Sequence, residues 1–255
     1  MSGTTAGVAD FGMSTYTFGD DLPAVERLAL VASAYEPVST RLLDDWGTRD
    51  AGLALDLGCG PGFSTQLLAR LLMPRKLIGV DQSPEFLEVA RARVPDAEFQ
   101  ARDITTGALS RTPADLVYAR LVLAHLPDPL ATAMRWCEGL GPDGTLLIED
   151  LEAVEAPRGP LQTYERVSAT IVQQGGGLMY AGQALAPLGG RCLAVTVPAA
   201  LAAAIYLLNV RRWLHEAPAA VSDAELADLE TALTATAHAD AGTVSWIVRQ
   251  IAVRA

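Results

Sequence analysis

Between residues 53 and 150, short apolar runs of strand length alternate with segments of helical periodicity. The predicted strands span 52–57, 76–81, 97–101, 114–119 and 144–150, and the predicted helices span 63–73, 83–94 and 129–140. Such alternation places helices on both faces of a mostly parallel sheet, because each crossover helix packs back onto the strands that it connects. The pattern predicts an α/β, doubly wound fold.

The rest of the chain is mainly helical by the same criterion. Apolar periodicity predicts helices within the first 50 residues, over 22–35 and 36–46. After residue 151, segments 155–189 and 198–241 read as helical, with strands predicted at 191–197 and 243–253. We therefore expect a helical lid over residues 1–50. One domain over 51–255 follows, with helical cap insertions at about 155–189 and 198–241.

Three glycines stand at alternate positions after the first predicted strand: Gly58, Gly60 and Gly62. Glycine adopts positive φ and lets the backbone lie close to a ligand. Ligands of open α/β sheets bind outside the carboxyl ends of the strands, where this loop lies. The dinucleotide motif needs a third small residue for close helix packing, and Phe63 stands there instead. The loop predicts a nucleotide-sized ligand other than NAD or FAD.

Segment 55–65, LDLGCGPGFST, resembles motif I of class I S-adenosylmethionine-dependent methyltransferases, whose signature is E/D-x-G-x-G-x-G. Segments 79–91, 100–105 and 115–129 resemble the later motifs of that family, in the same order. The resemblance implies a seven-stranded sheet with an antiparallel last strand. It also implies S-adenosylmethionine as the cofactor, with the methionine end against the glycine loop.

The resemblance also assigns individual residues to the cofactor. Asp81 would accept hydrogen bonds from both ribose hydroxyls, and Asp103 would accept one from the adenine amino group, with Ile104 against the purine. The remaining residues implied are Asp56, Gly58, Cys59, Gly60, Gln82, Ala119 and Arg120. Segment 14–30 resembles the lid of bacterial natural-product methyltransferases. There Tyr16 would cap the methyl donor and Arg27 would reach the methionine carboxylate, unless both lie on an ordinary helix surface.

The predicted reaction is methylation of a small molecule on oxygen or nitrogen, in preference to carbon, in bacterial secondary metabolism. Methyl transfer from a sulfonium is an in-line displacement that needs a base only where the acceptor retains its proton. His125 follows the fourth strand and is the candidate base, although it could equally be a packing residue near the cofactor. Glu149, Asp150, Glu152 and Glu155 either face the acceptor or form a solvated run. The alternative function is a cyclisation or rearrangement without methyl transfer.

Charge and cysteine content limit the partners. Thirty acidic side chains against 19 basic ones give a net charge of −11, which disfavours nucleic-acid substrates. The three cysteines have no metal-ligand spacing, so we expect no metal site and a reducing, cytoplasmic location. Segment 192–208 is apolar but too short for a membrane span and contains Pro198. The apolar helix predicted over 198–214 would cover the pocket mouth or a second subunit, so a homodimer is possible.

Overall fold

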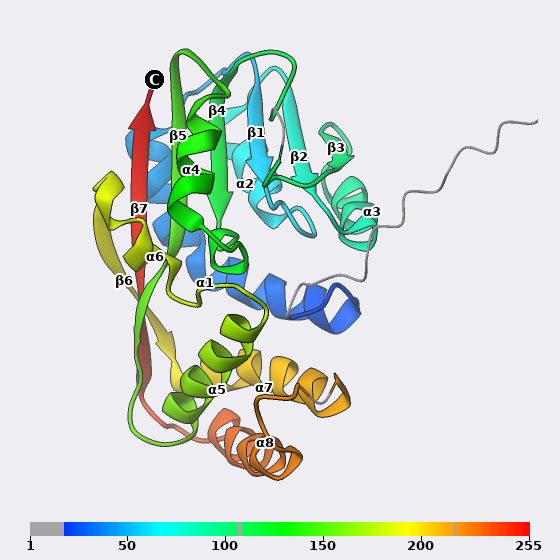
Figure 1. Ribbon diagram of the computed structural model, residues 1–255, viewed down its shortest axis with the longest axis vertical. Coiled ribbons are helices and arrows are strands. Elements are labelled where there is room, and N and C mark those ends of the chain that lie inside the picture. Colours follow the sequence, from blue (N-terminus) through cyan, green and yellow to red (C-terminus); the bar gives the residue numbers. More distant parts are fainter. Residues whose placement is uncertain (1–17, 107–108, 217) are drawn as a thin grey trace, which may run out of the picture.

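The computed structural model describes residues 18–106, 109–216 and 218–255 (Figure 1). Its strands form one sheet in the order β3-β2-β1-β4-β5-β7-β6, and β7 runs antiparallel to both of its neighbours. The strands are β1 (Ala54–Leu57), β2 (Leu77–Asp81), β3 (Glu98–Ala101), β4 (Ala114–Arg120), β5 (Leu140–Glu155), β6 (Arg191–Pro198) and β7 (Thr243–Arg254). The predicted doubly wound sheet of seven strands with a reversed last strand is confirmed.

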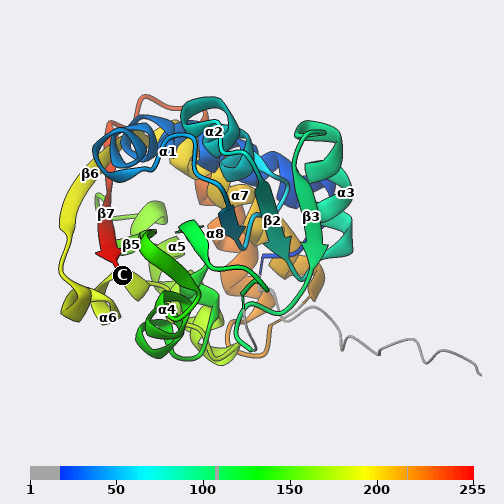
Figure 2. The ribbon, with the colours of Figure 1, turned by 90° about the horizontal axis from the view of Figure 1, so that it is seen from above.

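Helices cover both faces of this sheet (Figure 2). Helices α1 (Leu22–Trp46) and α2 (Phe63–Leu72) lie on one face, where Leu42 and Leu68 pack against Leu116 of β4. Helices α4 (Pro129–Cys137) and α6 (Ala181–Ala184) lie on the other face, where Trp136 is fully buried. Helix α3 (Pro84–Arg93) connects β2 to β3. Burial on both faces explains why β1 is apolar throughout except at one residue.

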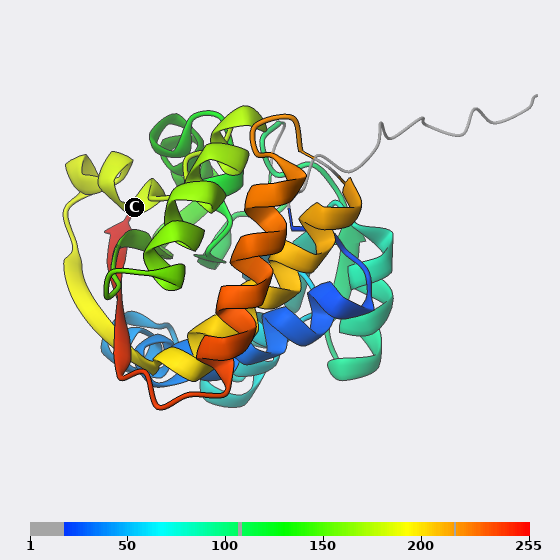
Figure 3. The ribbon, with the colours of Figure 1, turned by 90° about the horizontal axis from the view of Figure 1, so that it is seen from below.

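A layer of three further helices lies beyond the carboxyl ends of the parallel strands (Figures 1 and 3). These are α5 (Pro160–Gln174), α7 (Ala199–Glu216) and α8 (Asp223–Ala237). They share a hydrophobic core with the lower parts of β5, β6 and β7, centred on Tyr164, Val210 and Trp213.

Several predicted boundaries differ from the structure. A single helix, α1, spans both helices predicted over 22–46, with Pro37 inside it. Strand β5 continues to Glu155 because β7 pairs with it along this length, so residues 155–159 are not helical. The segment predicted as helical over 155–189 is broken after α5 into α6 and a 3-10 turn, η2 (Ala186–Leu188), and β6 fills the gap before the second predicted segment. Within the described ranges, no helix combines the length and hydropathy that crossing a membrane requires.

Candidate functional site

The glycine loop after β1 depends on three left-handed backbone conformations. Gly58, Gly60 and Gly62 have φ values of +66°, +51° and +84°. A Cβ on Gly58 would lie 2.4 Å from Val122 Cγ2, and one on Gly62 would lie 3.0 Å from Ala90. A Cβ on Gly60 would meet nothing closer than 3.9 Å, so this position needs glycine for its φ alone. The loop is therefore held in one shape with its backbone exposed to the cavity in front of it.

Asp56 anchors this loop from behind. Its Oδ2 accepts hydrogen bonds from Ser64 Oγ (2.7 Å) and Thr65 Oγ1 (2.6 Å) in the first turn of α2. Burial raises the pKa of the Asp56 carboxyl to about 6, although those two hydrogen bonds oppose the shift. The side chain is 1% exposed and does not line the cavity. Asp56 therefore does not face the cavity, although the resemblance implies a direct contact with the cofactor. Its side chain instead links the first turn of α2 to β1.

Asp81, at the end of β2, connects the loop to α3. Its Oδ2 accepts the Gly60 N–H at 2.8 Å, and its Oδ1 accepts the Ser83 N–H at 2.9 Å. Ser83 caps α3 by accepting the Phe86 N–H at 3.1 Å. Desolvation raises the Asp81 pKa, and the backbone hydrogen bonds partly offset it. Because carboxylate oxygens accept more than one hydrogen bond, both can also receive a ligand hydroxyl.

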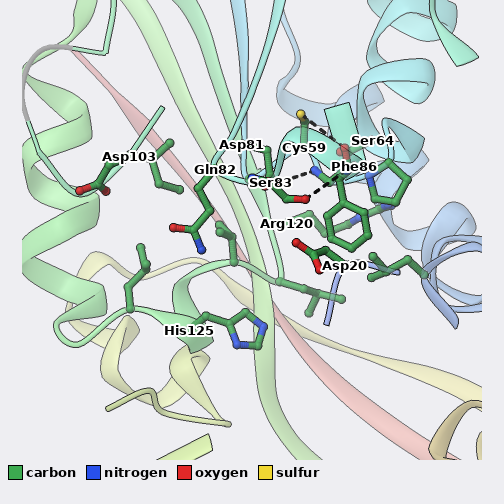
Figure 4. Close-up of a pocket in the computed structure, with 18 of the residues that line it drawn as sticks. Asp20, Cys59, Ser64, Asp81, Gln82, Ser83, Phe86, Asp103, Arg120 and His125 are labelled. Atoms are coloured by element: carbon green, nitrogen blue, oxygen red, sulfur yellow. Dashed lines mark hydrogen bonds between the residues drawn. The ribbon is translucent and has the colours of Figure 1, made fainter. Parts of the chain in front are cut away.

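A cavity of about 430 Å³, here called the large cavity, opens in front of this loop. It lies between the carboxyl ends of β1 and β4, where the strand order reverses. In the view of Figure 4, Asp103 lies on the side opposite Cys59 and Ser64, and His125 lies at the bottom. Of the residues predicted from the sequence, nine line this cavity: Gly58, Cys59, Gly60, Asp81, Gln82, Asp103, Ile104, Arg120 and His125.

The other predicted residues lie elsewhere. Ala119 is buried in the core beneath the cavity, and Arg27 lines a neighbouring cavity instead. Tyr16 lies outside the described residues. The Cys59 thiol is buried, and desolvation raises its pKa well above the usual value, so it is a poor nucleophile.

Asp103 and Ile104 form the far end of the large cavity, after β3. Asp103 Oδ1 accepts hydrogen bonds from the N–H and Oγ1 of Thr105 (2.7 and 2.6 Å), and its Oδ2 accepts one from Thr106 (3.2 Å). Desolvation opposes ionisation, but these hydrogen bonds outweigh it and lower the Asp103 pKa. Trp136 Nε1 donates to the Ile104 carbonyl at 2.9 Å. The end of the cavity thus presents a fixed carboxylate and a fixed apolar side chain.

A second cavity of about 120 Å³, here called the small cavity, adjoins the large one. Leu28, Val31, Leu121 and His125 line both. Leu121 follows β4 with a φ of +55°, an uncommon conformation for a non-glycine residue, and its N–H donates to the Glu149 carbonyl at 2.8 Å. This strained residue turns the chain between the two cavities.

The small cavity is surrounded by aromatic rings and ionisable side chains. Its rings belong to Phe18, Tyr35, Tyr164, Tyr206 and Trp246, and its charged groups to Arg27, Asp150 and Glu165. Sequence reasoning identified none of the rings and not Glu165, because their helical or strand spacing indicates only which face of an element is buried. They come from five separate segments that meet only in the folded chain.

His125 lies in the short helix η1 (Leu123–His125) at the junction of the two cavities. Its ring meets the Phe18 ring edge-on, with 5.5 Å between centroids. Burial, and then the positive charge of Arg27, lower the His125 pKa to about 3. Since a general base works best with a pKa near the working pH, this neutral imidazole is a weak one.

The acidic run on β5 does not form a solvated loop. Glu149 is fully buried, with partners in Ser39 Oγ (2.6 Å), Tyr118 Oη (2.5 Å) and Gln250 Nε2 (2.6 Å). Glu152 forms an ion pair with Arg249 at 2.6 Å, and Glu155 is exposed. Of the four carboxylates, only Asp150 lines either cavity.

Backbone N–H groups of η1 and of β5 itself hold Asp150. Its Oδ2 accepts the Leu123 N–H at 3.1 Å, and its Oδ1 accepts its neighbour Leu151 N–H at 2.9 Å. Burial raises the Asp150 pKa to about 7, and the backbone hydrogen bonds only partly counter this. The group therefore titrates near neutrality beside the small cavity. In the described part of the chain, no three His, Cys, Asp or Glu side chains are grouped as metal ligands would be.

Comparison with known proteins agrees with this geometry. A family model described as a methyltransferase domain matches residues 49–177, which is about half of the chain. The chain belongs to this methyltransferase family. Membership of the class I S-adenosylmethionine-dependent methyltransferases and S-adenosylmethionine as cofactor, both predicted from the motifs, are confirmed.

Two curated methyltransferases illustrate how far the similarity extends. The chain is 36% identical over 141 residues to a trans-aconitate 2-methyltransferase of Variovorax paradoxus, covering 55% of this chain and 54% of that protein. It is 39% identical over 145 residues to another from Methylobacterium radiotolerans, covering 56% and 50%. The chain thus spans about half the length of these relatives.

One solved structure is similar to this chain over most of its length. The cyclopropane synthase MmaA2 of Mycobacterium tuberculosis superposes with a TM-score of 0.55 at 16% identity, covering 88% of this chain and 84% of that one. At this identity the match concerns the fold alone.

The residues of this methyltransferase fit its cofactor. The large cavity falls within the ~300–1,000 Å³ typical of small-molecule sites. Its exposed loop backbone and two carboxylates, Asp81 and Asp103, suit a cationic sulfonium nucleoside with hydroxyl and amino donors.

Proposed function

We propose that this chain transfers the methyl group of S-adenosylmethionine, bound in the large cavity, to a small molecule bound in the small cavity. One observation carries the proposal: the two cavities adjoin, and Leu28, Val31, Leu121 and His125 line both. A donor in the large cavity and an acceptor in the small cavity would therefore approach each other beside His125. Alignment and exclusion of water then supply much of the acceleration of a displacement reaction.

Several residues would hold the cofactor. The backbone at Gly58 and Gly60 would contact the methionine end, Asp81 would accept the ribose hydroxyls, and Asp103 with Ile104 would contact the adenine. Charge-assisted hydrogen bonds to Asp81 are the strongest of these contacts. When bound, S-adenosylmethionine supplies an electrophilic methyl group on a positively charged sulfur.

His125 keeps its proposed place beside the reacting atoms, but with a different role. An imidazole whose pKa is about 3 stays neutral and takes up a proton poorly. We therefore assign it to orienting the acceptor by contact, and leave proton removal to another group.

Calorimetry and a product assay test this proposal. Titration with S-adenosylmethionine, S-adenosylhomocysteine and NAD should show binding of the first two and none of NAD. Incubation with acceptors should yield S-adenosylhomocysteine in amounts equal to the methylated product. Conversion of an acceptor without consumption of S-adenosylmethionine would contradict methyl transfer and favour a cyclisation or rearrangement. Tight binding of NAD alone would end the proposal.

The finer predictions remain part of this proposal. We retain oxygen or nitrogen as the methylated atom, a role in bacterial secondary metabolism, a cytoplasmic location and a possible homodimer. We also retain the division into a lid over 1–50 and a domain over 51–255. The −11 charge supports a small-molecule acceptor over nucleic acid.

A further inference from the structure

We propose that the acceptor is a compact organic amine, held as a cation by Asp150 and Glu165, and not a polycarboxylate such as trans-aconitate. This inference rests on the proposed function, because it names the substrate class of the small cavity. It separates this chain from what the names of its relatives state about their substrates.

The charge of the small cavity supports a cation. Two carboxylates and one guanidinium line it, those of Asp150, Glu165 and Arg27, and His125 is neutral. Among the described residues, neither carboxylate forms an ion pair with an arginine or lysine. Buried carboxylates are stabilised by a cationic partner, which the ligand would provide. Three further negative charges would instead be repelled.

Hydrogen bonds from two tyrosines orient the Glu165 carboxylate. Tyr180 Oη donates to Glu165 Oε2 at 3.1 Å, and Tyr206 also hydrogen-bonds to this carboxylate. Trp246 Nε1 in turn donates to Tyr206 Oη at 3.0 Å. Desolvation raises the Glu165 pKa, while both tyrosines favour the ionised form. Two tyrosines, one in the turn before α6 and one in α7, thus orient the carboxylate before any ligand arrives.

The aromatic walls suit the same ligand. Tyr164 and Tyr206 stack with centroids 3.8 Å apart, and Tyr35 stacks on Trp246 at 5.6 Å. Burial, and then the charges of Asp150, Glu149 and Glu165, raise the pKa of the Tyr35 hydroxyl. Because these rings stack on one another, and Tyr164 also stacks on Trp213, what they give the cavity is an apolar lining that packs against alkyl and aryl groups. A polycarboxylate would lose hydration against such a lining without compensation.

The size of the small cavity limits the acceptor. Its volume is about 120 Å³. An apolar protein cavity of ~150 Å³ is known to admit benzene. The enclosed part of the acceptor is therefore a single ring or a short branched chain.

The chemistry of an amine also needs a proton acceptor, and Asp150 is suitably placed. An ammonium ion has no lone pair, so its proton must first pass to the Asp150 carboxylate. The freed nitrogen lone pair then forms the N–C bond, and the methyl carbon–sulfur bond breaks with both electrons remaining on sulfur. The products are the N-methylated ammonium ion of the acceptor and S-adenosylhomocysteine, and Asp150 later releases its proton to solvent. A pKa of about 7 suits this exchange.

Binding to the protein saturated with S-adenosylhomocysteine tests the inference without relying on turnover. The probes are benzylamine, cyclohexylamine and isobutylamine, with benzyl alcohol as the neutral counterpart and trans-aconitate as the polycarboxylate. We expect at least one amine to bind, with benzylamine preferred to benzyl alcohol, and no binding of trans-aconitate. Binding of trans-aconitate, or of none of the three amines, would overturn the inference.

Glu165→Gln tests the charge, and Glu155→Gln is its control because it removes one exposed carboxylate from the end of β5. A lost charge-assisted hydrogen bond should weaken amine binding about 10- to 100-fold in Glu165→Gln. Glu155→Gln should change it less than twofold. Both variants should retain S-adenosylhomocysteine binding, which shows that they fold. Equal amine affinity in the two variants would refute the role of Glu165.

An assay of turnover separates this inference from the proposed function. If S-adenosylhomocysteine forms with trans-aconitate and with no amine, methyl transfer stands and the amine inference is wrong. If the protein fails to bind S-adenosylmethionine, the proposed function itself is wrong.

Discussion

Replacement of Asp81 by alanine probes the double role that the structure gives this residue. Its carboxylate accepts the Gly60 and Ser83 N–H groups and faces the large cavity. Loss of charge-assisted hydrogen bonds to ligand hydroxyls costs about 1.5–3 kcal/mol, or roughly 10- to 150-fold in Kd. The same change leaves two backbone donors without their partner. Because water in the cavity can replace part of that contact, we expect the free energy of unfolding to fall by only about 1–3 kcal/mol.

The assay is calorimetry with S-adenosylmethionine together with denaturant unfolding of the same variants. Asp81→Asn is the matched control for shape, because its amide oxygen can still accept one of the two N–H groups. Its loss of stability should be smaller than that of Asp81→Ala, while its loss of cofactor affinity should remain large. Unchanged affinity for S-adenosylmethionine with a marked fall in the free energy of unfolding would refute the ribose contact. Asp81 would then serve only to stabilise the loop.

Three further predictions concern the loop, the buried carboxylate and the histidine. Gly58→Ala should destabilise the fold by about 1–3 kcal/mol beyond the cost of its positive φ, because its Cβ would lie 2.4 Å from Val122. Gly242→Ala, at a φ of +79° with open space, isolates the backbone cost of about 1–2 kcal/mol, and equal losses in unfolding experiments would exclude the clash. The Asp150 pKa is raised to about 7, so its contribution to stability is complete below pH 4 and is lost as the pH rises through 7. Between pH 4 and 7, this group should lower the free energy of unfolding by up to about 1.4 kcal/mol per pH unit, and Asp150→Asn should remove that dependence. An unchanged pH dependence of stability in the variant would contradict the raised pKa. His125→Gln should lower kcat without removing any inflection of the pH–rate profile near pH 6–7, whereas a lost inflection would identify His125 as the base.

The sequence alone determined the half of the site that is built from local motifs. Gly58, Gly60, Asp81 and Asp103 each lie within a few residues of the end of a strand that the apolar pattern predicts. Carboxyl ends of neighbouring parallel strands meet at one edge of the sheet, so these residues had to converge. For the same reason nine of the predicted site residues line one cavity.

Only the tertiary structure decided the small cavity, which is the proposed acceptor site. Tyr164, Tyr206 and Trp246 come from α5, α7 and β7, and their sequence spacing shows burial but not their shared contacts. The protonation of His125 and Asp150 also depends on the whole fold. Their pKa values of about 3 and about 7 arise from burial by segments that are distant in the sequence. Motifs within one strand and its following turn are set by local conformation. The shape and charge of the small cavity depend on how helices after residue 160 dock against α1 and β5, which local conformation does not specify.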